Sequence, residues 1–278
     1  MSMTTPDQIR FDQPHAGLQR LTARFGGHAY DLHRHETYAV GLTLWGAQSF
    51  HYRGALQTSS GGQVMVIHPD EAHDGHAERD GGFAYRMLYV DPAAVGAALG
   101  GATPFVPDVV SDDPALAALL QEAFADFPQA LEPLAVDAVV ARLADRLSIR
   151  GDAPAKPSRG APARRAVGRA REFLIAEAPR TVASEELEKV SGLDRFALAR
   201  HFRAAFGTSP HRFQVGRRLV RAQELIADGI ALSEVAAATG FADQSHLTRH
   251  FSARFGLTPG RWANLAHRTA RAAQPSKR

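Results

Sequence analysis

The sequence contains no cysteine among its 278 residues. The absence of thiols excludes a disulfide framework and any metal site built on thiolates. No apolar run approaches the roughly 20 residues of a membrane-spanning helix, and no basic and apolar leader opens the chain. The content of 45% hydrophobic and 22% charged residues is typical of globular proteins. We therefore expect a cytoplasmic protein, long enough for two domains.

Positive charge is concentrated in the C-terminal half of the chain. From Lys156 onward, 22 lysines and arginines stand against 10 acidic residues, a net charge of +12, whereas the preceding part has 10 against 19, or −9. This asymmetry favours a nucleic-acid partner for the C-terminal side. A basic solvated surface of no special function remains the alternative.

A short unit occurs twice in this basic half. Residues 200–213 align without a gap with residues 249–262, at an offset of 49 positions, and a helix-like run ending in a glycine precedes each copy, at 185–192 and 233–240. A repeat of fixed period indicates one supersecondary unit used twice. The order of helix, glycine turn and helix is that of the helix-turn-helix motif.

The second helix of each unit is predicted to have one apolar face, which is buried, and one face that points outward. Asp194 and Asp243 are the predicted N-caps, and Gly207 and Gly256 the predicted ends. Side chains near such a helix N-terminus read base edges in the major groove. One such helix could be a merely solvated face, but a matching second copy favours DNA recognition. The outward residues are Arg195, Phe196, Ala199, Arg200 and Arg203 in the first copy and Gln244, Ser245, Thr248, Arg249 and Ser252 in the second.

A predicted helix from Pro210 to about Asp228 joins the two units. At 1.5 Å per residue it spans roughly 27 Å, near the separation of about 34 Å between successive major grooves on one face of DNA. The sequence therefore predicts that one chain contacts DNA twice. We expect base contacts from Arg195, Arg200, Gln244, Thr248 and Arg249, and phosphate contacts from Arg203, Arg217 and Arg218.

These residues resemble the AraC/XylS family of transcription regulators over about Arg165 to His267. The similarity is carried by Arg218-Leu219, by Gly240-Phe241, by Phe255-Gly256 and by Thr258-Pro259. Asp194 stands where members often have serine, Ala199 where they often have a polar residue, and Trp262 where they often have tyrosine. The resemblance implies double-stranded DNA and RNA polymerase as partners, and activation as the commoner output.

The N-terminal part alternates with a period near two between Leu18 and Tyr89, which predicts an all-β sandwich or barrel. Residues 1–15 are expected to be a loose arm. Strands are predicted at residues 18–25, 38–45, 48–53, 63–68 and 83–90.

Two histidine-containing segments, His33-Arg-His35-Glu36 and Pro69-Asp-Glu-Ala-His73, resemble the signature segments of cupin barrels in regulators. His33, His35 and His73, with His76 as a further candidate, could hold a metal, but the glutamate that metal cupins have after the second histidine is missing. We therefore expect ligand contacts or a structural role, with no metal or cofactor. The candidate ligand-binding residues for an unknown small-molecule effector are His33, His35, Tyr38, Trp45, His73 and Tyr85, and Phe50 and Tyr52 are further candidates for the pocket wall.

After Asp91 the period becomes helical. A helical hairpin is predicted at about 114–150, whose apolar stripes either pack on their own barrel or form a homodimer contact. Residues 151–163, with three prolines and two glycines, have the composition of a linker. Residues 271–278 form a basic tail.

The predicted fold is therefore α+β and multidomain. A cupin-like β-barrel with its helical hairpin, at residues 1–150, binds an effector or dimerises, and an all-α domain at 164–270 carries helix-turn-helix units at about 184–206 and 232–255. The predicted function is a ligand-responsive, sequence-specific transcription regulator and not an enzyme. The alternatives are a metal-dependent cupin activity, or a barrel that only dimerises, attached to the DNA-binding domain.

Overall fold

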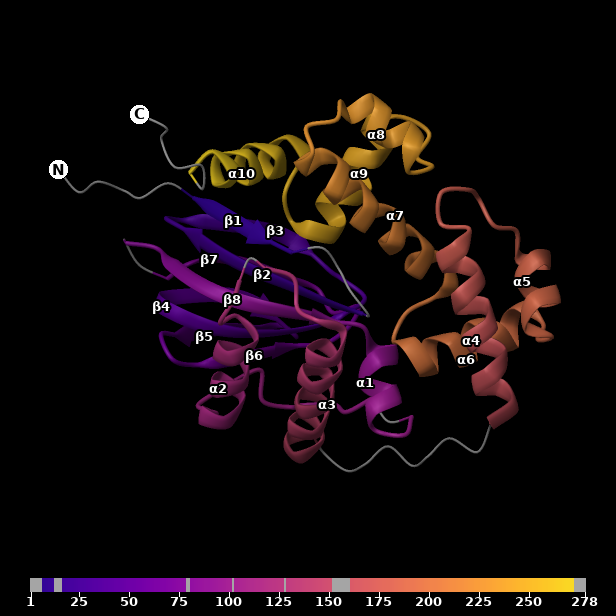
Figure 1. Ribbon diagram of the computed structural model, residues 1–278, viewed down its shortest axis with the longest axis horizontal. Helices are drawn as coiled ribbons and strands as arrows, with labels where there is room; N and C mark the ends of the chain where they lie inside the picture. Colours follow the sequence, from indigo (N-terminus) through magenta and orange to yellow (C-terminus); the bar gives the residue numbers. More distant parts are fainter. Residues whose placement is uncertain are drawn as a thin grey trace.

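The computed structural model describes residues 7–12, 17–78, 81–101, 103–127, 129–151 and 161–272 (Figure 1), with the side chains of 161–162 and 267–272 left aside. Most of the predicted linker, residues 152–160, and the tail from 273 lie outside the described residues. The helix α4 already begins at Ala161, inside the range predicted for the linker. Figure 1 shows the β-strands of the N-terminal part on one side and the helices of the C-terminal part on the other.

The predicted antiparallel β domain is confirmed, with β4 as its common strand. Residues 38–46 of β4 pair with β6 and β8, and residues 47–52 pair with β5 and β7, so that one strand belongs to two sheets. The predicted closed barrel is wrong, because among the described residues these pairings do not close into a ring. The strands are β1 (Gln8–Phe11), β2 (Leu18–Phe25), β3 (His28–His33), β4 (Tyr38–Tyr52), β5 (Ala55–Ser60), β6 (Val64–Ile67), β7 (His73–Ala77), β8 (Phe83–Val90) and β9 (Val110–Ser111).

The predicted break between strands at Gly46 is wrong. Gly46 lies inside β4 with a φ of 72°, next to a shift of register between Thr43 and Trp45. The left-handed backbone conformation, which glycine adopts without strain, lets the strand bend from one sheet to the other. A β-carbon at this position would overlap the carbonyl oxygen of Gly82. A glycine that resembles a turn in sequence therefore acts as a bulge.

Three helices cover one face of the sheet: α1 (Pro92–Ala98), α2 (Pro114–Ala123) and α3 (Pro133–Arg150). Asp91 and Asp113 cap the first two, since their carboxylates accept bonds from the first-turn amides. The predicted stripes of α2 and α3 pack on their own sheet, in a core with Val40 and Leu88. Leu134, an apolar residue in the first turn of α3, is an exception and is exposed.

The C-terminal part contains both predicted helix-turn-helix units. Asp194 and Asp243 cap α6 and α9, and Gly207 and Gly256 end these helices with a φ of 72° and 65°. The predicted linking helix is α7. The helices are α4 (Ala161–Ala176), α5 (Ser184–Ser191), α6 (Arg195–Phe206), α7 (Pro210–Ala227), α8 (Leu232–Ala238), α9 (Gln244–Phe255) and α10 (Pro259–Ala272). None of the helices in the described ranges is both long and apolar enough to cross a membrane.

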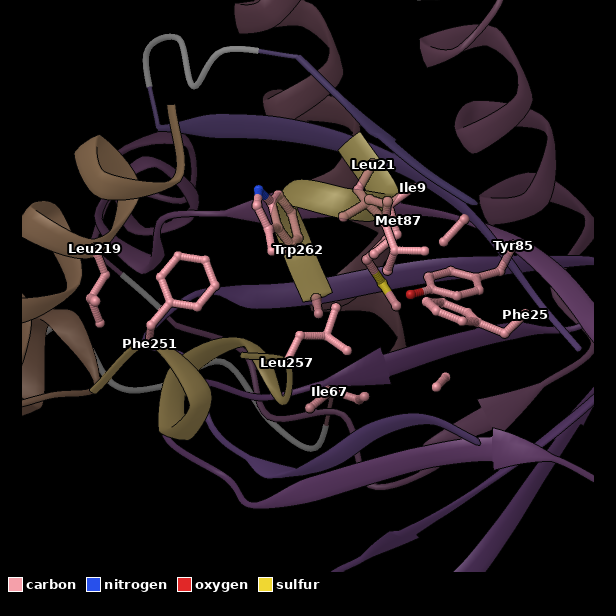
Figure 2. Packing of buried hydrophobic residues seen from close by; sticks show 14 of the residues in the cluster. Ile9, Leu21, Phe25, Ile67, Tyr85, Met87, Leu219, Phe251, Leu257 and Trp262 are labelled. Carbon is pink, nitrogen blue, oxygen red and sulfur yellow. The ribbon is translucent and has the colours of Figure 1, made fainter. Parts of the chain in front are cut away.

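The two units are packed differently. The first has a core of its own, which includes Phe202 and Phe213. The second shares one core with the inside of the β domain, and Figure 2 shows Trp262 in this cluster with Phe251 on one side and Met87 on the other. The described residues thus form two domains in contact, with the second unit seated on the sheet.

The strand β1 was not predicted, since residues 1–15 are expected to be a loose arm. Ile9 is buried in the shared core, and the ring of Phe11 lies 4.9 Å from that of Trp262. Four residues carry too short a pattern to be read as a strand. These residues pair with β2 and contact α10, which is more than 240 positions away in sequence.

We expect Gly46→Ala to lower the midpoint of thermal unfolding far more than Gly54→Ala. Both glycines have a positive φ, of 72° and 78°, so an alanine costs about 1–2 kcal/mol at either site. Only at Gly46 does the new methyl group also meet a carbonyl oxygen, while nothing lies within 4 Å at Gly54. Equal midpoints for the two variants would contradict the bulge.

Candidate functional site

The N-terminal turns of α9 and α6 present most of the residues predicted to read bases. Gln244, Ser245 and Arg249 are exposed on α9, and Thr248 is half-buried beside them. These positions follow directly after the cap, where a helix in the major groove contacts base edges. The structure therefore brings the four predicted residues of the second unit together on one accessible face.

On α6 the predicted residues divide into free and paired side chains. Phe196 is 76% exposed, and Arg200, one turn later, is exposed without an ion-pair partner among the described residues. Arg195 is exposed but pairs with Glu188 at 3.1 Å and Glu185 at 3.2 Å on α5. Reading a base with Arg195 would require these pairs to open.

Two residues predicted to contact phosphates lie elsewhere. Arg218 is buried on α7 and donates to the carbonyl oxygens of Ala178, Arg180 and Gly240 at 2.6, 2.7 and 3.1 Å. This argues against its predicted phosphate contact, because the guanidinium is buried and three of its five N–H groups are bound to these carbonyls. Arg217 is half-buried and lines a pocket between the domains. Helical periodicity alone does not distinguish these inward arginines from exposed ones.

Four of the six predicted ligand-binding residues come together inside the β domain. The ring of His73 lies 4.2 Å from that of His33 and 4.9 Å from that of His35, and these histidines line one cavity with Tyr85. Tyr30, whose hydroxyl is 2.6 Å from that of Tyr85, joins them without having been predicted. Its strand β3 was not recognised in the sequence.

The three histidines are held as neutral side chains. Their Nδ1 atoms lie 2.8–3.1 Å from the backbone carbonyls of Asp31, Thr37 and Glu71, so each Nδ1 carries the proton and donates it. Burial lowers the pKa of His33 and His35 well below its usual value and that of His73 to about 4. Within the described ranges no group of three histidine, aspartate or glutamate side chains is arranged to hold a metal ion.

Tyr38 and Trp45 are not in this cavity, which corrects their prediction as ligand contacts. Tyr38 points to the helix-covered face, where its hydroxyl donates to the carbonyl of Pro104 at 2.7 Å. Trp45 is on the surface under the guanidinium of Arg24, 4.8 Å from the ring centroid. Side chains alternate between the two faces of a strand, so Tyr38 faces the covering helices and not the cavity. The bulge at Gly46 directs Trp45 away from the cavity. Phe50 and Tyr52, named as further wall candidates, are buried in the inner core, and Phe50 lines the cavity.

A second pocket lies between the domains and shares Tyr30, His33, His35 and Tyr89 with the inner cavity. Most of the lining of this pocket is apolar. The β domain contributes Leu18, Leu21 and Tyr30 among others, and the C-terminal part contributes Phe206, Phe213, Val220, Phe255 and Trp262. Sequence analysis had no signal for this pocket, because it forms only where the two domains meet.

Several polar groups in this pocket have no partner within the described part of the chain. The indole Nε1 of Trp262, the Nε of Arg254 and the Nε2 of His35 are all buried and unbonded. Arg254 also pairs with Glu36 at 2.7 Å, and burial raises the pKa of the Glu36 carboxyl while Arg254 counters that rise. Arg217 has no carboxylate partner among the described residues. The Nε1 of Trp262 and the Nε of Arg254 are donors, whereas the Nε2 of His35, whose proton is on Nδ1, is an acceptor.

Both parts of the chain are similar to known proteins. Residues 15–144 match the family model of the AraC-like ligand binding domain, and residues 187–264 match that of a helix-turn-helix domain. The uncharacterized HTH-type transcriptional regulator YbfI of Bacillus subtilis is 24% identical over 242 residues, which cover 84% of this chain and 86% of that protein.

Solved structures of ToxT from Vibrio cholerae have the same fold. The apo K231A variant superposes with a TM-score of 0.63 at 10% identity, covering 91% of this chain and 99% of that chain. A ToxT structure with bound unsaturated fatty acid gives a TM-score of 0.61 at 10% identity, covering 95% and 98% of the two chains. With both domains matched in the order that the structure shows, the chain belongs to the AraC/XylS family of DNA-binding transcription regulators, with an AraC-like ligand-binding domain before its helix-turn-helix domain.

Proposed function

We propose that this regulator reads an asymmetric DNA site with two recognition helices, α6 and α9, and that an apolar acid bound between its domains controls this reading. The observation that carries the proposal is that one end of α9 faces solvent while its other end lines the pocket between the domains. Its N-terminal half presents Gln244 and Arg249 to solvent, and Arg254 and Phe255 at its other end line the pocket between the domains.

The repeat indicates what the two helices have in common. Arg200 and Arg249 occupy equivalent positions and are both exposed. A guanidinium in this place is suited to the O6 and N7 atoms of a guanine. We therefore expect a guanine at the same place in both half-sites.

The neighbouring positions differ between the units, which supports an asymmetric site. Phe196 and Ala199 of α6 are apolar and suit the methyl group of thymine, whereas Ser245 and Thr248 of α9 are polar. Gln244 suits an adenine. Phosphate contacts are expected from Arg203 and from amides at helix N-termini.

The chemistry of the pocket supports an effector with an apolar body and one acidic or carbonyl group. Apolar walls with few polar groups are typical of small-molecule sites. The indole N–H of Trp262 has no acceptor and Arg217 no ion-pair partner among the described residues, and a carboxylate gives the strongest bond to a guanidinium. Acids of this kind are bound to the similar ToxT, namely an unsaturated fatty acid and a naphthalenyl butenoic acid.

We also propose that the protein activates transcription and forms a homodimer. Activation of transcription with RNA polymerase as the partner is supported by the family. A homodimer contact through the outer side of α3 is supported by the exposed Leu134 and Ile149, which lie outside the core of the domain.

Arg249→Ala is expected to weaken binding to the specific site by about 1–3 kcal/mol and to leave binding to random duplexes nearly unchanged, because the lost contact reads a base. The measurement is a titration of purified protein with duplexes selected from a random pool. Arg142→Ala serves as the control of equal charge, since Arg142 pairs with Glu122 on the helical hairpin. An equal loss on specific and random DNA would assign Arg249 to the phosphates.

Trp262→Phe is expected to weaken binding of cis-9-octadecenoic acid about tenfold, because it removes one buried donor while it keeps an aromatic ring. The chain has two tryptophans, so Trp45→Phe, at the surface, is the matched control. Calorimetry on each variant, with the acid and with its methyl ester, measures the effect. Equal affinity of the wild-type protein for acid and ester would contradict an acid-binding pocket.

A further inference from the structure

The β domain meets the C-terminal ends of both proposed recognition helices, through the loop between β6 and β7 and through the end of β3 with Arg34 after it. At the end of α6, a β-carbon on Gly207 would lie 3.0 Å from Pro69, and at the end of α9 a β-carbon on Gly256 would lie 2.7 Å from the carbonyl oxygen of Asp31. The backbone N–H of Arg34 also donates to the carbonyl of Ala253 at 3.1 Å. Both units are therefore in contact with the effector domain at the same end.

An acidic side chain lies at the first of these contacts. Asp70, between β6 and β7, forms an ion pair with Arg212 on α7 and lies 3.7 Å from Arg203 on α6. The aspartate side chain is only 13% exposed, whereas those of Arg203 and Arg212 are 69% and 50% exposed. The two arginines thus stand at the protein surface with one carboxylate between them.

The two arginines have the geometry of a phosphate site. Arg203 is on the outward face of α6 with Arg200, and Arg212 is in the first turn of α7, where the helix dipole favours an anion. A carboxylate held by two guanidinium groups has the same charge and the same acceptor atoms as a backbone phosphate. Asp70 also has a φ of 65°, an uncommon conformation for a residue other than glycine.

We propose that Arg203 and Arg212 form a binding site for a DNA phosphate, and that Asp70 of the effector domain occupies it in the free protein. This inference rests on the proposed DNA binding through α6. Arg212 thereby becomes a DNA contact that the sequence did not indicate. DNA must displace Asp70 to reach both arginines, so the contact opposes binding of the first unit.

The same loop is joined to the effector pocket. The backbone N–H of Asp70 donates to the carbonyl of His35 at 2.6 Å, and the ring of His35 lines both cavities. The next residue, Glu36, holds Arg254 of α9. A ligand that shifts the segment from His33 to Thr37 therefore acts directly on the contacts that this segment and the Asp70 loop make with both helix-turn-helix units.

The test compares charge-removing substitutions at adjacent positions. Asp70→Asn and Asp70→Gly both tolerate a positive φ. Glu71→Gln removes the same charge one residue away, where Glu71 pairs with Arg53 of its own domain at 2.8 Å. Affinity for the selected duplex is measured for each at several salt concentrations, with melting curves to show that every variant is folded.

Both Asp70 variants are expected to bind the selected duplex about five- to twentyfold more tightly than Glu71→Gln, with a slope of log affinity against log salt that is steeper by about 1–2. In the Asp70→Asn background, Arg212→Ala should cost more affinity than in the wild type, since the arginine is then unmasked. Equal affinities for the Asp70 variants and Glu71→Gln overturn the proposal. Failure of the wild type and all variants to select any duplex instead overturns the proposed DNA reading, and the masked site with it.

Discussion

The arrangement of this regulator depends on one apolar core shared between the β domain and the second helix-turn-helix unit. Phe251, Leu257 and Trp262 fill the open side of the sheet together with Leu21 and Met87. Separating the two would expose these side chains to water, at roughly 25 cal/mol for each Å². Packing on the effector domain therefore fixes the position of α9, whereas the first unit has a core of its own.

Electrostatics adds to this contact. The acidic N-terminal part and the basic C-terminal part meet through ion pairs at Asp70, at Glu36 with Arg254, and at Asp91 with Arg171. Such pairs weaken with salt where they are exposed, but the pair of Glu36 is largely buried. The ligand-binding domain thus partly neutralises the positive charge of the helix-turn-helix domain.

Local chemistry made much of the fold predictable. The repeat, the caps Asp194 and Asp243 and the strand at Leu18–Phe25 follow from patterns within short windows, and the structure has them. The errors share one physical origin, which is that long-range packing decides the outcome. Arg218 resembles a surface arginine until the loops around it are placed, and Tyr38 resembles a pocket residue until the face of its strand is known. The pocket at Trp262 belongs to neither domain alone, so no window of sequence contains it.

The most direct test of this coupled arrangement is to measure the affinity for cis-9-octadecenoic acid in the presence and absence of the selected operator duplex, together with the affinity for the duplex with and without the acid. If one interface serves both ligands, each must change the affinity for the other by the same factor, different from one. The account predicts such a reciprocal factor of about 5–150. Affinities that are unchanged by the other ligand, with both ligands bound, would contradict a pocket that controls the recognition helices.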